Sequence, residues 1–388
     1  GDYESEIVLE AARQMKNKEG PNNVLFAHIA LVPTIITGEM KTKPLQHSVR
    51  QLLARGIMPD IIIARSDKPL PKELKEKIAL FCNVDTTAVF SSPNVPSIYE
   101  LPLVLKEQGL DETVGAKLAL KFSSRDLKEH AKLVENLKQV QSSKTRLKIA
   151  VVGKYAAMDD AYASVFEALM HAGAANNVAV DTTMVDSEKL EKTKPSSLDE
   201  FDALVVPGGF GSRGINGKIN AVQYARENNK PLLGLCYGLQ LQVIEFARNV
   251  LKLKRADSTE INPKTPCPVI YIMPEKEKEK DLGGTLRLGV KKTLLEKNTK
   301  AIELYKSNEI LKRHRHRFEV NPRYITQLEK KGLVFSGKSE DKKRMEILEL
   351  PTHTFFMGTQ YHPEFDSRLG KPEPLFDALV KAAIKNKN

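Results

Sequence analysis

The first third of the chain alternates short, fully apolar runs with stretches whose apolar residues recur at helical spacing. Strands as uniformly apolar as these are typical of a parallel sheet that is covered by helices on both faces. The pattern predicts strands at residues 24–31, 60–64 and 88–91, and helices at residues 7–15, 45–53, 72–82, 98–108 and 111–120. This region is therefore expected to form one α/β unit.

A second α/β pattern begins at residue 147. It predicts strands at 147–153, 178–185 and 203–206, helices at 161–172, 215–227 and 374–385, and a β-richer section with strands at 269–273, 285–290, 333–336, 345–349 and 355–360. The stretch 123–146 is highly charged, poor in glycine and weakly periodic, which is typical of a partly helical linker. We therefore predict an α/β protein of two domains, 1–122 and 147–388, joined by the linker 123–146.

Composition narrows the classes of ligand. The 388 residues carry a net charge of +11 that is spread over both halves, and the chain has no tryptophan and no interleaving of aromatic with basic residues. Small anions such as nucleotides explain this balance at least as well as nucleic acid does, so we predict no nucleic-acid partner. No apolar run reaches the roughly 18 residues that span a bilayer, and the start does not resemble a signal peptide, so we expect a cytoplasmic protein without a membrane partner. Cys82, Cys236 and Cys267 show no CxxC spacing, which favours free thiols over disulfides or zinc ligands.

The segment Gly234-Leu-Cys236-Tyr-Gly238 joins a predicted strand at residues 231–235 to a helical pattern. The two glycines allow a sharp turn from strand to helix, as in a nucleophile elbow, with cysteine in place of serine. The first amides of the helix would then favour a Cys236 thiolate. By itself this pattern also fits a buried structural cysteine.

A candidate base lies in Thr359-Gln-Tyr-His362-Pro-Glu364. His362 would stand at the end of a strand, with Glu364 close enough to orient its ring, so that Cys236, His362 and Glu364 form a triad. Alone, this motif more often marks a structural histidine that is paired with a local carboxylate. The order Cys, His, Glu within one α/β domain favours the triad.

A glycine-rich turn, Pro207-Gly-Gly-Phe-Gly211, follows another apolar strand. Glycines there let backbone N–H groups approach a ligand closely, as an oxyanion hole requires. An ordinary turn or a weak phosphate loop would have the same sequence.

Together these motifs resemble the class I (triad) glutamine amidotransferase domain of the CTP synthases. Two further motifs of that domain lie at residues 282–289 and 313–320, and the first half resembles the family's amidoligase (synthetase) domain at residues 1–5, 38–46 and 77–84. The likeness covers nearly the whole chain. It implies a P-loop-like amidoligase domain that lacks its N-terminal part, followed by a class I glutaminase domain.

The resemblance implies that UTP, ATP and glutamine are converted to CTP, ADP, phosphate and glutamate, the last step of de novo pyrimidine nucleotide synthesis. Cys236 would attack the glutamine amide, while the backbone amides of Gly209 and Tyr237 hold the oxyanion. The family's glutamine-binding positions fall on Gly238, Leu239, Gln240, Glu260 and Arg317. A carboxylate and a guanidinium suit a zwitterion. In isolation, the basic run at residues 313–317 would instead indicate a phosphate or nucleic-acid patch.

In the amidoligase half, the resemblance places UTP and CTP contacts on one set of residues: Asp2, Tyr3, Glu4, Lys41, Thr42, Lys43, Pro44, Leu45, Gln46 and Lys77. It places Arg65 and Val95 near ATP. Any single lysine here would by default be a solvated surface residue, so the assignment depends on the ordered motif. The family also implies CTP as feedback inhibitor, GTP as allosteric activator, and homotetramers that can form filaments.

Some expected parts have no counterpart in the sequence. The chain has no Gly-x-x-x-x-Gly-Lys-Ser/Thr motif, and the carboxylates that bind Mg²⁺ with ATP are expected upstream of Gly1. We therefore expect this chain to hydrolyse glutamine at best. Tyr237 and Asp257 are mild departures from the family pattern. The alternatives are a glutaminase-only fragment, another triad amidotransferase with a different acceptor, and a nucleotide-binding or filament-forming structural protein with an inactive glutaminase.

Overall fold

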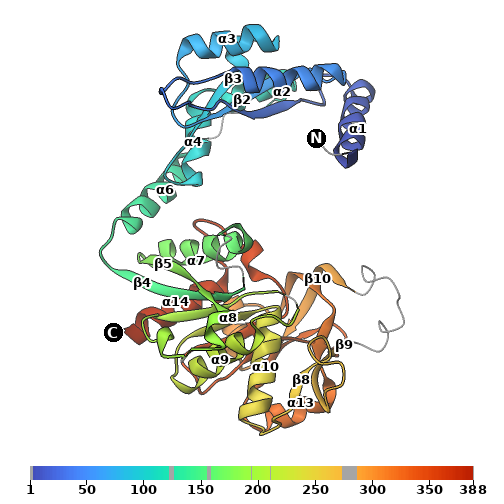
Figure 1. The fold of residues 1–388 in the computed structure, drawn as a ribbon, viewed down its shortest axis with the longest axis vertical. Helices are drawn as coiled ribbons and strands as arrows, with labels where there is room; N and C mark the ends of the chain where they lie inside the picture. Colours follow the sequence, from blue (N-terminus) through green and yellow to red (C-terminus); the bar gives the residue numbers. More distant parts are fainter. Residues whose placement is uncertain are drawn as a thin grey trace. The chain divides into compact units, whose positions relative to one another are not determined.

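The computed structural model describes residues 3–121, 126–154, 159–193, 195–209, 211–272 and 286–387. Asp2, Phe210 and residues 282–285 of the glycine-rich motif lie outside these ranges. The chain divides into two compact units, Gly1–Glu135 and Asn136–Asn388, and the division falls within helix α6 (Lys128–Gln141) (Figure 1). Each unit is described by itself.

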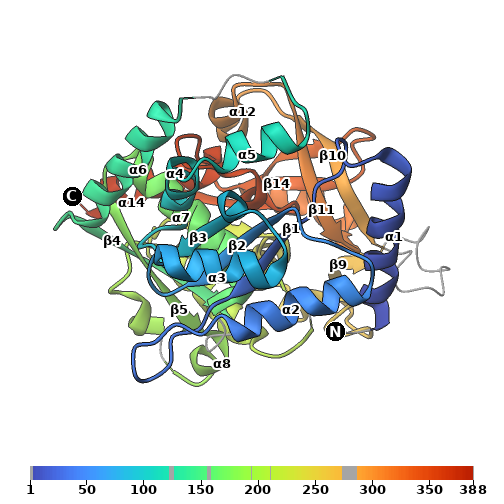
Figure 2. The same ribbon diagram turned by 90° about the horizontal axis from the view of Figure 1, so that it is seen from above.

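The first unit is built on a parallel sheet of three strands in the order β1 (Ala27–Leu31), β2 (Ile61–Ser66) and β3 (Val89–Pro93). Its helices are α1 (Tyr3–Glu19), α2 (Lys43–Ala54), α3 (Lys72–Cys82), α4 (Leu101–Glu107) and α5 (Leu110–Lys117), with short 3-10 turns η1 (Thr86–Ala88) and η2 (Ile98–Glu100). Helices α2 and α3 lie side by side over the sheet (Figure 2). The predicted α/β unit is confirmed.

Strand β1 corrects one expectation. The apolar run predicted a strand buried on both faces, but Ile29 and Leu31 are 62% and 60% exposed. Strand β1 lies at the edge of the sheet, and its burial alternates along the strand, so only one of its faces packs against the rest of the unit. Strand β2, in the middle of the same sheet, is buried along most of its length.

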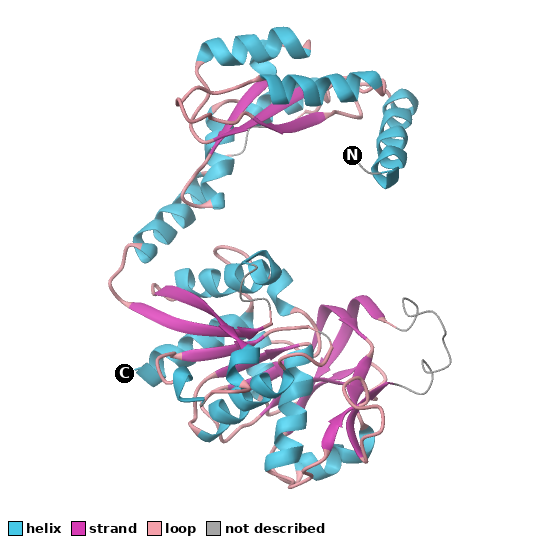
Figure 3. Ribbon diagram, in the orientation of Figure 1, coloured by secondary structure: helices cyan, strands magenta, loops and turns pink. Residues whose placement is uncertain are grey.

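The second unit contains a nine-stranded sheet in the order β11-β10-β13-β14-β15-β7-β6-β4-β5. Figure 3 shows the strands of this unit in magenta, with helices around them. The five strands from β15 to β5 are parallel and the remainder are antiparallel. Their bounds are β4 (Arg146–Gly153), β5 (Ala179–Asp186), β6 (Ala203–Val206), β7 (Leu232–Leu235), β10 (Arg287–Leu295), β11 (Glu309–His316), β13 (Val334–Ser339), β14 (Met345–Glu349) and β15 (Phe356–Thr359). A smaller sheet joins β8 (Ala256–Ser258), β9 (Cys267–Ile272) and β12 (Phe318–Val320).

Helices cover both faces of the large sheet, because alternate side chains of its apolar strands enter two separate cores. Helices α9 (Ile215–Glu227) and α10 (Tyr237–Asn249) pack in one core, and α7 (Ala163–Ala175) and α14 (Pro374–Lys387) in the other. The remaining elements are helices α8 (Ser187–Leu190), α12 (Lys300–Tyr305) and α13 (Pro322–Glu329), and 3-10 turns η3 (Asp159–Tyr162), η4 (Pro195–Leu198) and η5 (Pro363–Asp366). Within the described ranges, no helix combines the length and the apolar character that crossing a bilayer requires.

Candidate active site

Three neighbouring parallel strands, β6, β7 and β15, end at the same edge of the large sheet. The segments that follow them carry Gly208, Cys236 and His362, respectively. Carboxyl ends of parallel strands are where open α/β sheets bind their ligands. The topology therefore brings three motifs that are far apart in the sequence to one place.

Cys236 occupies the turn between β7 and α10, with φ 52° and ψ −97°. This left-handed φ is unusual for a residue with a side chain and matches the strained turn of a nucleophile elbow. The turn is tight, because a Cβ on Gly238 would lie 2.1 Å from the carbonyl oxygen of Val206. The backbone N–H of Cys236 donates to the carbonyl oxygen of Thr359 at 2.6 Å, which fixes the turn to β15.

His362 lies beside this turn. Its Nδ1 is 2.7 Å from Glu364 Oε1, and its backbone N–H donates to the carbonyl oxygen of Arg313 at 3.0 Å. A Cβ on Gly208 would lie 3.1 Å from His362 Cε1 and 3.7 Å from Cys236 Cβ, so Gly208 lies against both residues. Burial lowers the pKa of His362, but the hydrogen bonds with Cys236 and Glu364 outweigh it and raise the pKa to about 10. A protonated imidazole beside a cysteine favours a thiolate.

Two buried glutamines extend this cluster. Gln360 Nε2 lies 3.7 Å from Cys236 Sγ, and Gln240 Nε2 donates to Gln360 Oε1 at 3.2 Å and to the carbonyl oxygen of Phe318 at 3.0 Å. Gln240 was expected here, but the role of Gln360 was missed. Its one signal in the sequence is an amide side chain at the end of a predicted apolar strand, two residues before His362.

A cavity of about 780 Å³ opens in front of Cys236. Seven of the predicted residues line it: Gly209, Cys236, Tyr237, Gln240, Glu260, Arg317 and His362. Glu364 lies behind His362, Gly238 packs against Val206, and Leu239 is in the apolar core. The structure therefore brings most of the predicted glutaminase residues around one cavity.

Glu260 and Tyr237 also hold the glycine-rich turn. Glu260 Oε1 accepts the backbone N–H of Gly211 at 3.1 Å, and the Tyr237 hydroxyl donates to the carbonyl oxygen of Gly211 at 3.0 Å. Burial, assisted by Glu260, raises the pKa of Tyr237 well above its ordinary value, so its hydroxyl remains a donor. Asp257, the other departure from the family pattern, pairs with Arg248 at 3.2 Å.

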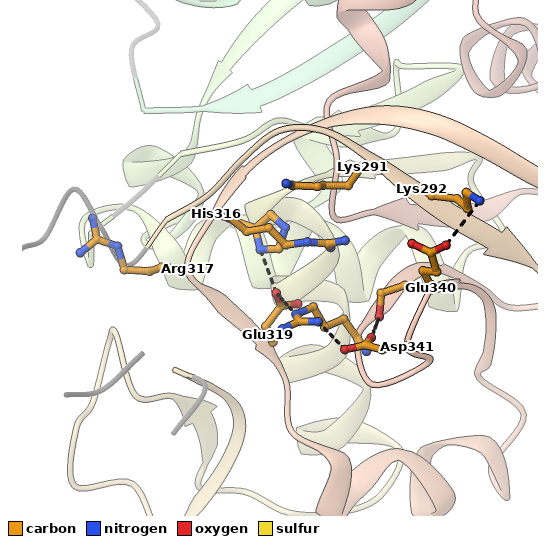
Figure 4. Close-up of a pocket in the computed structure, with 10 residues that line it drawn as sticks. Lys291, Lys292, His316, Arg317, Glu319, Glu340 and Asp341 are labelled. Carbon is orange, nitrogen blue, oxygen red and sulfur yellow. Dashed lines mark hydrogen bonds and ion pairs between the residues drawn. The ribbon is translucent and has the colours of Figure 1, made fainter. Parts of the chain in front are cut away.

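A second cavity, of about 510 Å³, shares His316 and Arg317 with the first (Figure 4). Its other lining residues include Arg287, Lys291, Arg344 and the buried Glu319. Glu319 Oε1 lies 3.4 Å from His316 Nδ1 and 3.7 Å from Arg344 Nε. Burial raises the pKa of Glu319 to about 8 against the effect of both arginines, and it lowers that of His316 to about 3.

The basic run at residues 313–317 lies mostly in β11, which the sequence did not predict as a strand. Alternation along this strand exposes Arg313 and Arg315 and buries His314 and His316. Arg317 follows the strand and lines both cavities. Exposed charged residues alternate with buried ones along β11, so the sequence contains no apolar run that would have predicted this strand.

In the first unit, the predicted UTP and CTP segment runs from the turn before α2 into its first turns. Gln46 Nε2 donates to Thr42 Oγ1 at 3.0 Å, and both side chains are buried. Lys41 mainly, and Lys77 more weakly, lower the pKa of Glu39, which places Lys77 near this segment. Among the other predicted residues, Lys43 and Pro44 lie in the first turn of α2, and Leu45 packs in the core. Tyr3 and Glu4 lie at the start of α1.

Arg65 is the penultimate residue of β2 and reaches the end of β3. Its guanidinium donates to the carbonyl oxygens of Ser92 at 2.8 Å and Pro93 at 3.0 Å. Val95 follows two residues later in the chain. Among the described residues of the whole chain, no group of three or more His, Cys, Asp or Glu side chains is placed to hold a metal ion.

Comparison with known proteins identifies the family. The profile described as "Glutamine amidotransferase class-I" matches residues 157–382, and that described as "CTP synthase N-terminus" matches residues 1–120. A CTP synthase of Pyrococcus abyssi is 50% identical over 389 aligned residues, which cover all of this chain and 72% of the relative. The chain belongs to the CTP synthase family. A CTP synthase of Caldanaerobacter subterraneus is 51% identical with the same coverage.

Structural comparison supports the same conclusion for the second unit. A solved Trypanosoma brucei structure, "CTPS - glutaminase domain with bound acivicin", is similar with a TM-score of 0.58 and 37% identity, over 62% of this chain and 94% of that one. The predicted class, an α/β protein with part of a CTP synthase amidoligase domain and a class I amidotransferase domain, is confirmed.

Proposed function

We propose that this member of the CTP synthases hydrolyses glutamine at Cys236 and that the ammonia released serves the ATP-dependent conversion of UTP to CTP. The observation that carries the proposal is the Cys236 elbow, with the His362–Glu364 pair beside it at the edge of one cavity. Family membership supports the choice of acceptor.

In the first step, the Cys236 thiolate attacks the side-chain amide carbon of glutamine, while His362 holds the thiol proton. The negative charge that develops on the carbonyl oxygen is held by the backbone N–H groups of Gly209 and Tyr237. His362 then passes its proton to the amide nitrogen. The C–N bond breaks, ammonia leaves, and a γ-glutamyl thioester remains on Cys236.

In the second step, His362 takes a proton from water, and the hydroxide attacks the thioester carbon. The C–S bond breaks, glutamate is released, and Cys236 returns to its starting state. Glu364 keeps His362 in one orientation throughout, because it accepts the hydrogen bond from Nδ1 and leaves Nε2 toward Cys236.

The zwitterionic end of glutamine is assigned to Glu260 and Arg317. A carboxylate can pair with the α-ammonium group and a guanidinium with the α-carboxylate. Both side chains line the same cavity as Cys236, and Gln240 Oε1 is buried without a hydrogen-bond partner among the described residues. An incoming amide N–H would satisfy that oxygen.

In the amidoligase half, ATP would phosphorylate O4 of UTP, and ammonia would displace the phosphate. We assign Lys41, Lys43, Gln46 and Lys77 to the pyrimidine nucleotide's phosphates, since lysines suit them as compact charges. We also assign contacts with UTP or CTP to Tyr3 and Glu4, and contacts with ATP to Arg65 and Val95. The described residues offer no magnesium site, so no step is assigned to that ion. Inhibition by CTP, activation by GTP and the tetramer stay predictions.

The test compares wild-type chain with Cys236→Ala in two assays, glutamate release from glutamine and CTP formation from UTP and ATP. We expect Cys236→Ala to release no glutamate. Any CTP synthesis that wild type performs with free ammonia should be unchanged in the variant. Glutamate release by the variant at the wild-type rate would contradict the proposal.

A further inference from the structure

Helix α9 carries a lysine in an unusual environment. The side chain of Lys218 is 1% exposed, and its Nζ has no hydrogen-bond partner within the described residues. Burying an ammonium group without a partner lowers the stability of the fold. If Lys218 served packing alone, an apolar side chain of similar size would fill the same space with no loss of stability. We therefore looked for a role of Lys218 other than packing in the residues around its ammonium group.

The ammonium of Lys218 lies near the two residues that form the site proposed for the oxyanion. Lys218 Nζ is 3.6 Å from the position that a Cβ on Gly209 would occupy, and 5.8 Å from the centroid of the Tyr237 ring. Gly209 and Tyr237 are the two residues whose backbone N–H groups are assigned to the oxyanion. A single positive charge thus lies next to Gly209 and beside the ring of Tyr237.

The neighbouring carboxylates are engaged elsewhere. Glu260 Oε1 accepts the N–H of Gly211, and Glu188 pairs with Arg213 at 2.7 Å. Lys154 adds a second positive charge, with its Nζ 3.6 Å from the Cβ position of Gly211. Burial, and more weakly the charge of Lys154, lower the pKa of Lys218 to about 7.

We propose that Lys218 is a positioning residue for glutamine hydrolysis, whose buried ammonium stabilises the negative charge that develops on the oxyanion held by Gly209 and Tyr237. The inference rests on the proposed function. It follows from electrostatics, because a charge fixed in a water-free interior acts strongly on a charge that forms nearby and needs no reorganisation when it does so. The same ammonium makes the electrostatic potential at the glycine-rich turn more positive.

The charged form of Lys218 is the one that assists, so its contribution is present below its pKa and disappears as the pH rises through about 7. The other charged or titratable groups around the turn are Lys154, Glu188, Arg213, Tyr237, Glu260 and His362. These groups are common to wild type and a Lys218 variant. The ratio of their activities therefore isolates Lys218.

The experiment measures kcat and KM for glutamine hydrolysis from pH 6 to 8.5 for wild type, Lys218→Met and Lys218→Arg. We expect Lys218→Met to lower kcat about 10-fold at pH 6 with little change in KM, less than the ~100- to 1,000-fold loss of a direct oxyanion donor. The ratio of wild-type to Lys218→Met activity should fall as the pH rises through 7. Lys218→Arg should keep most of the activity at low pH and lose less of it at high pH, because arginine stays charged.

Thermal unfolding separates this role from a structural one. Lys218→Met should unfold at the wild-type temperature or above, since it removes a buried unpaired charge. Lys230→Met is the matched control, because the half-buried Lys230 Nζ donates to the carbonyl oxygen of Asp199 at 3.0 Å. That control should lower the unfolding temperature and leave kcat unchanged.

Three results would overturn the Lys218 inference, and they can be told apart. If wild type hydrolyses glutamine and Lys218→Met matches its kcat across the pH range, the Lys218 inference is overturned and the proposed function stands. If wild type neither hydrolyses glutamine nor is labelled at Cys236 by a glutamine-like chloroketone, the proposed function fails and the inference fails with it. Loss of kcat in Lys218→Met in proportion to loss of folded protein would also overturn the inference.

Discussion

Glu364 holds His362 through a single carboxylate oxygen. Oε1 lies 2.7 Å from Nδ1, whereas Oε2 is buried without a hydrogen-bond partner in the described part of the chain. The interaction orients the ring and contributes to the raised pKa of His362. Replacing the carboxylate therefore changes both the geometry and the protonation of the candidate base.

Glu364→Gln should lower the pKa of His362 and reduce kcat for glutamine hydrolysis by at least ~10-fold. NMR titration of the histidine ring measures the pKa, and a coupled assay measures kcat. Asp366→Asn is the control, because Asp366 pairs with Lys312 at 2.8 Å on the same turn. An unchanged His362 titration in Glu364→Gln would contradict the account.

Gln360→Met should reduce kcat/KM for glutamine by about 10-fold or more, since it removes the donor to Cys236 Sγ and the acceptor for Gln240. Loss of a buried hydrogen bond should also lower the free energy of unfolding by about 1–3 kcal/mol. Gln242→Met is the matched control, because Gln242 is equally buried on α10 but donates to the carbonyl oxygen of Met357 at 3.1 Å. Equal activity losses in the two variants would show that packing alone is responsible.

Gly208→Ala should reduce kcat without unfolding the domain. The new Cβ would lie 3.1 Å from His362 Cε1, which is tight enough to push the ring away from Cys236. Gly238→Ala gives the contrast, because its Cβ would meet the backbone oxygen of Val206 at 2.1 Å and should lower the unfolding temperature strongly. Full activity of Gly208→Ala would show that the ring is not confined by this glycine.

Glu319→Gln should change how stability depends on pH. The folded carboxyl, with a pKa of about 8, keeps its proton where the unfolded one, with an ordinary value of 4.5, has lost it. The wild type is therefore destabilised progressively as the pH rises from 4.5 to about 8. Urea unfolding at pH 5 and pH 8 should show a smaller decline in the variant.

The control for this experiment is Glu340→Gln, whose carboxylate lies at the same cavity but is largely exposed. Its stability should follow that of wild type at both pH values. Parallel declines in wild type and Glu319→Gln would mean that Glu319 does not hold its proton in the folded state.

The sequence predicted the elements with strong apolar patterns well. Helix α9 and strand β6 have the predicted bounds, and the strand and helix on either side of Cys236 are present. The resemblance to class I amidotransferase motifs predicted which residues line the cavity, and the parallel strands bring those motifs together because they end at one edge of the sheet. These features depend on local pattern and topology, both of which a sequence carries.

Other features depend on packing between distant segments. Strand β11 was missed because its buried positions hold lysine and histidine. The burial of Lys218 and Glu319 arises from tertiary neighbours, and surface exposure is the usual expectation for both residue types. The exposed face of β1 was missed because an apolar run does not reveal that a strand lies at an edge.

Trapping the covalent intermediate on Cys236 tests the central claim most directly. Wild-type chain is mixed with glutamine, quenched in acid during turnover, digested and analysed by mass spectrometry. We predict a γ-glutamyl thioester on the peptide that contains Cys236, absent without glutamine and absent from Cys236→Ala. Glutamate release without any adduct on Cys236, and undiminished in Cys236→Ala, would contradict this prediction.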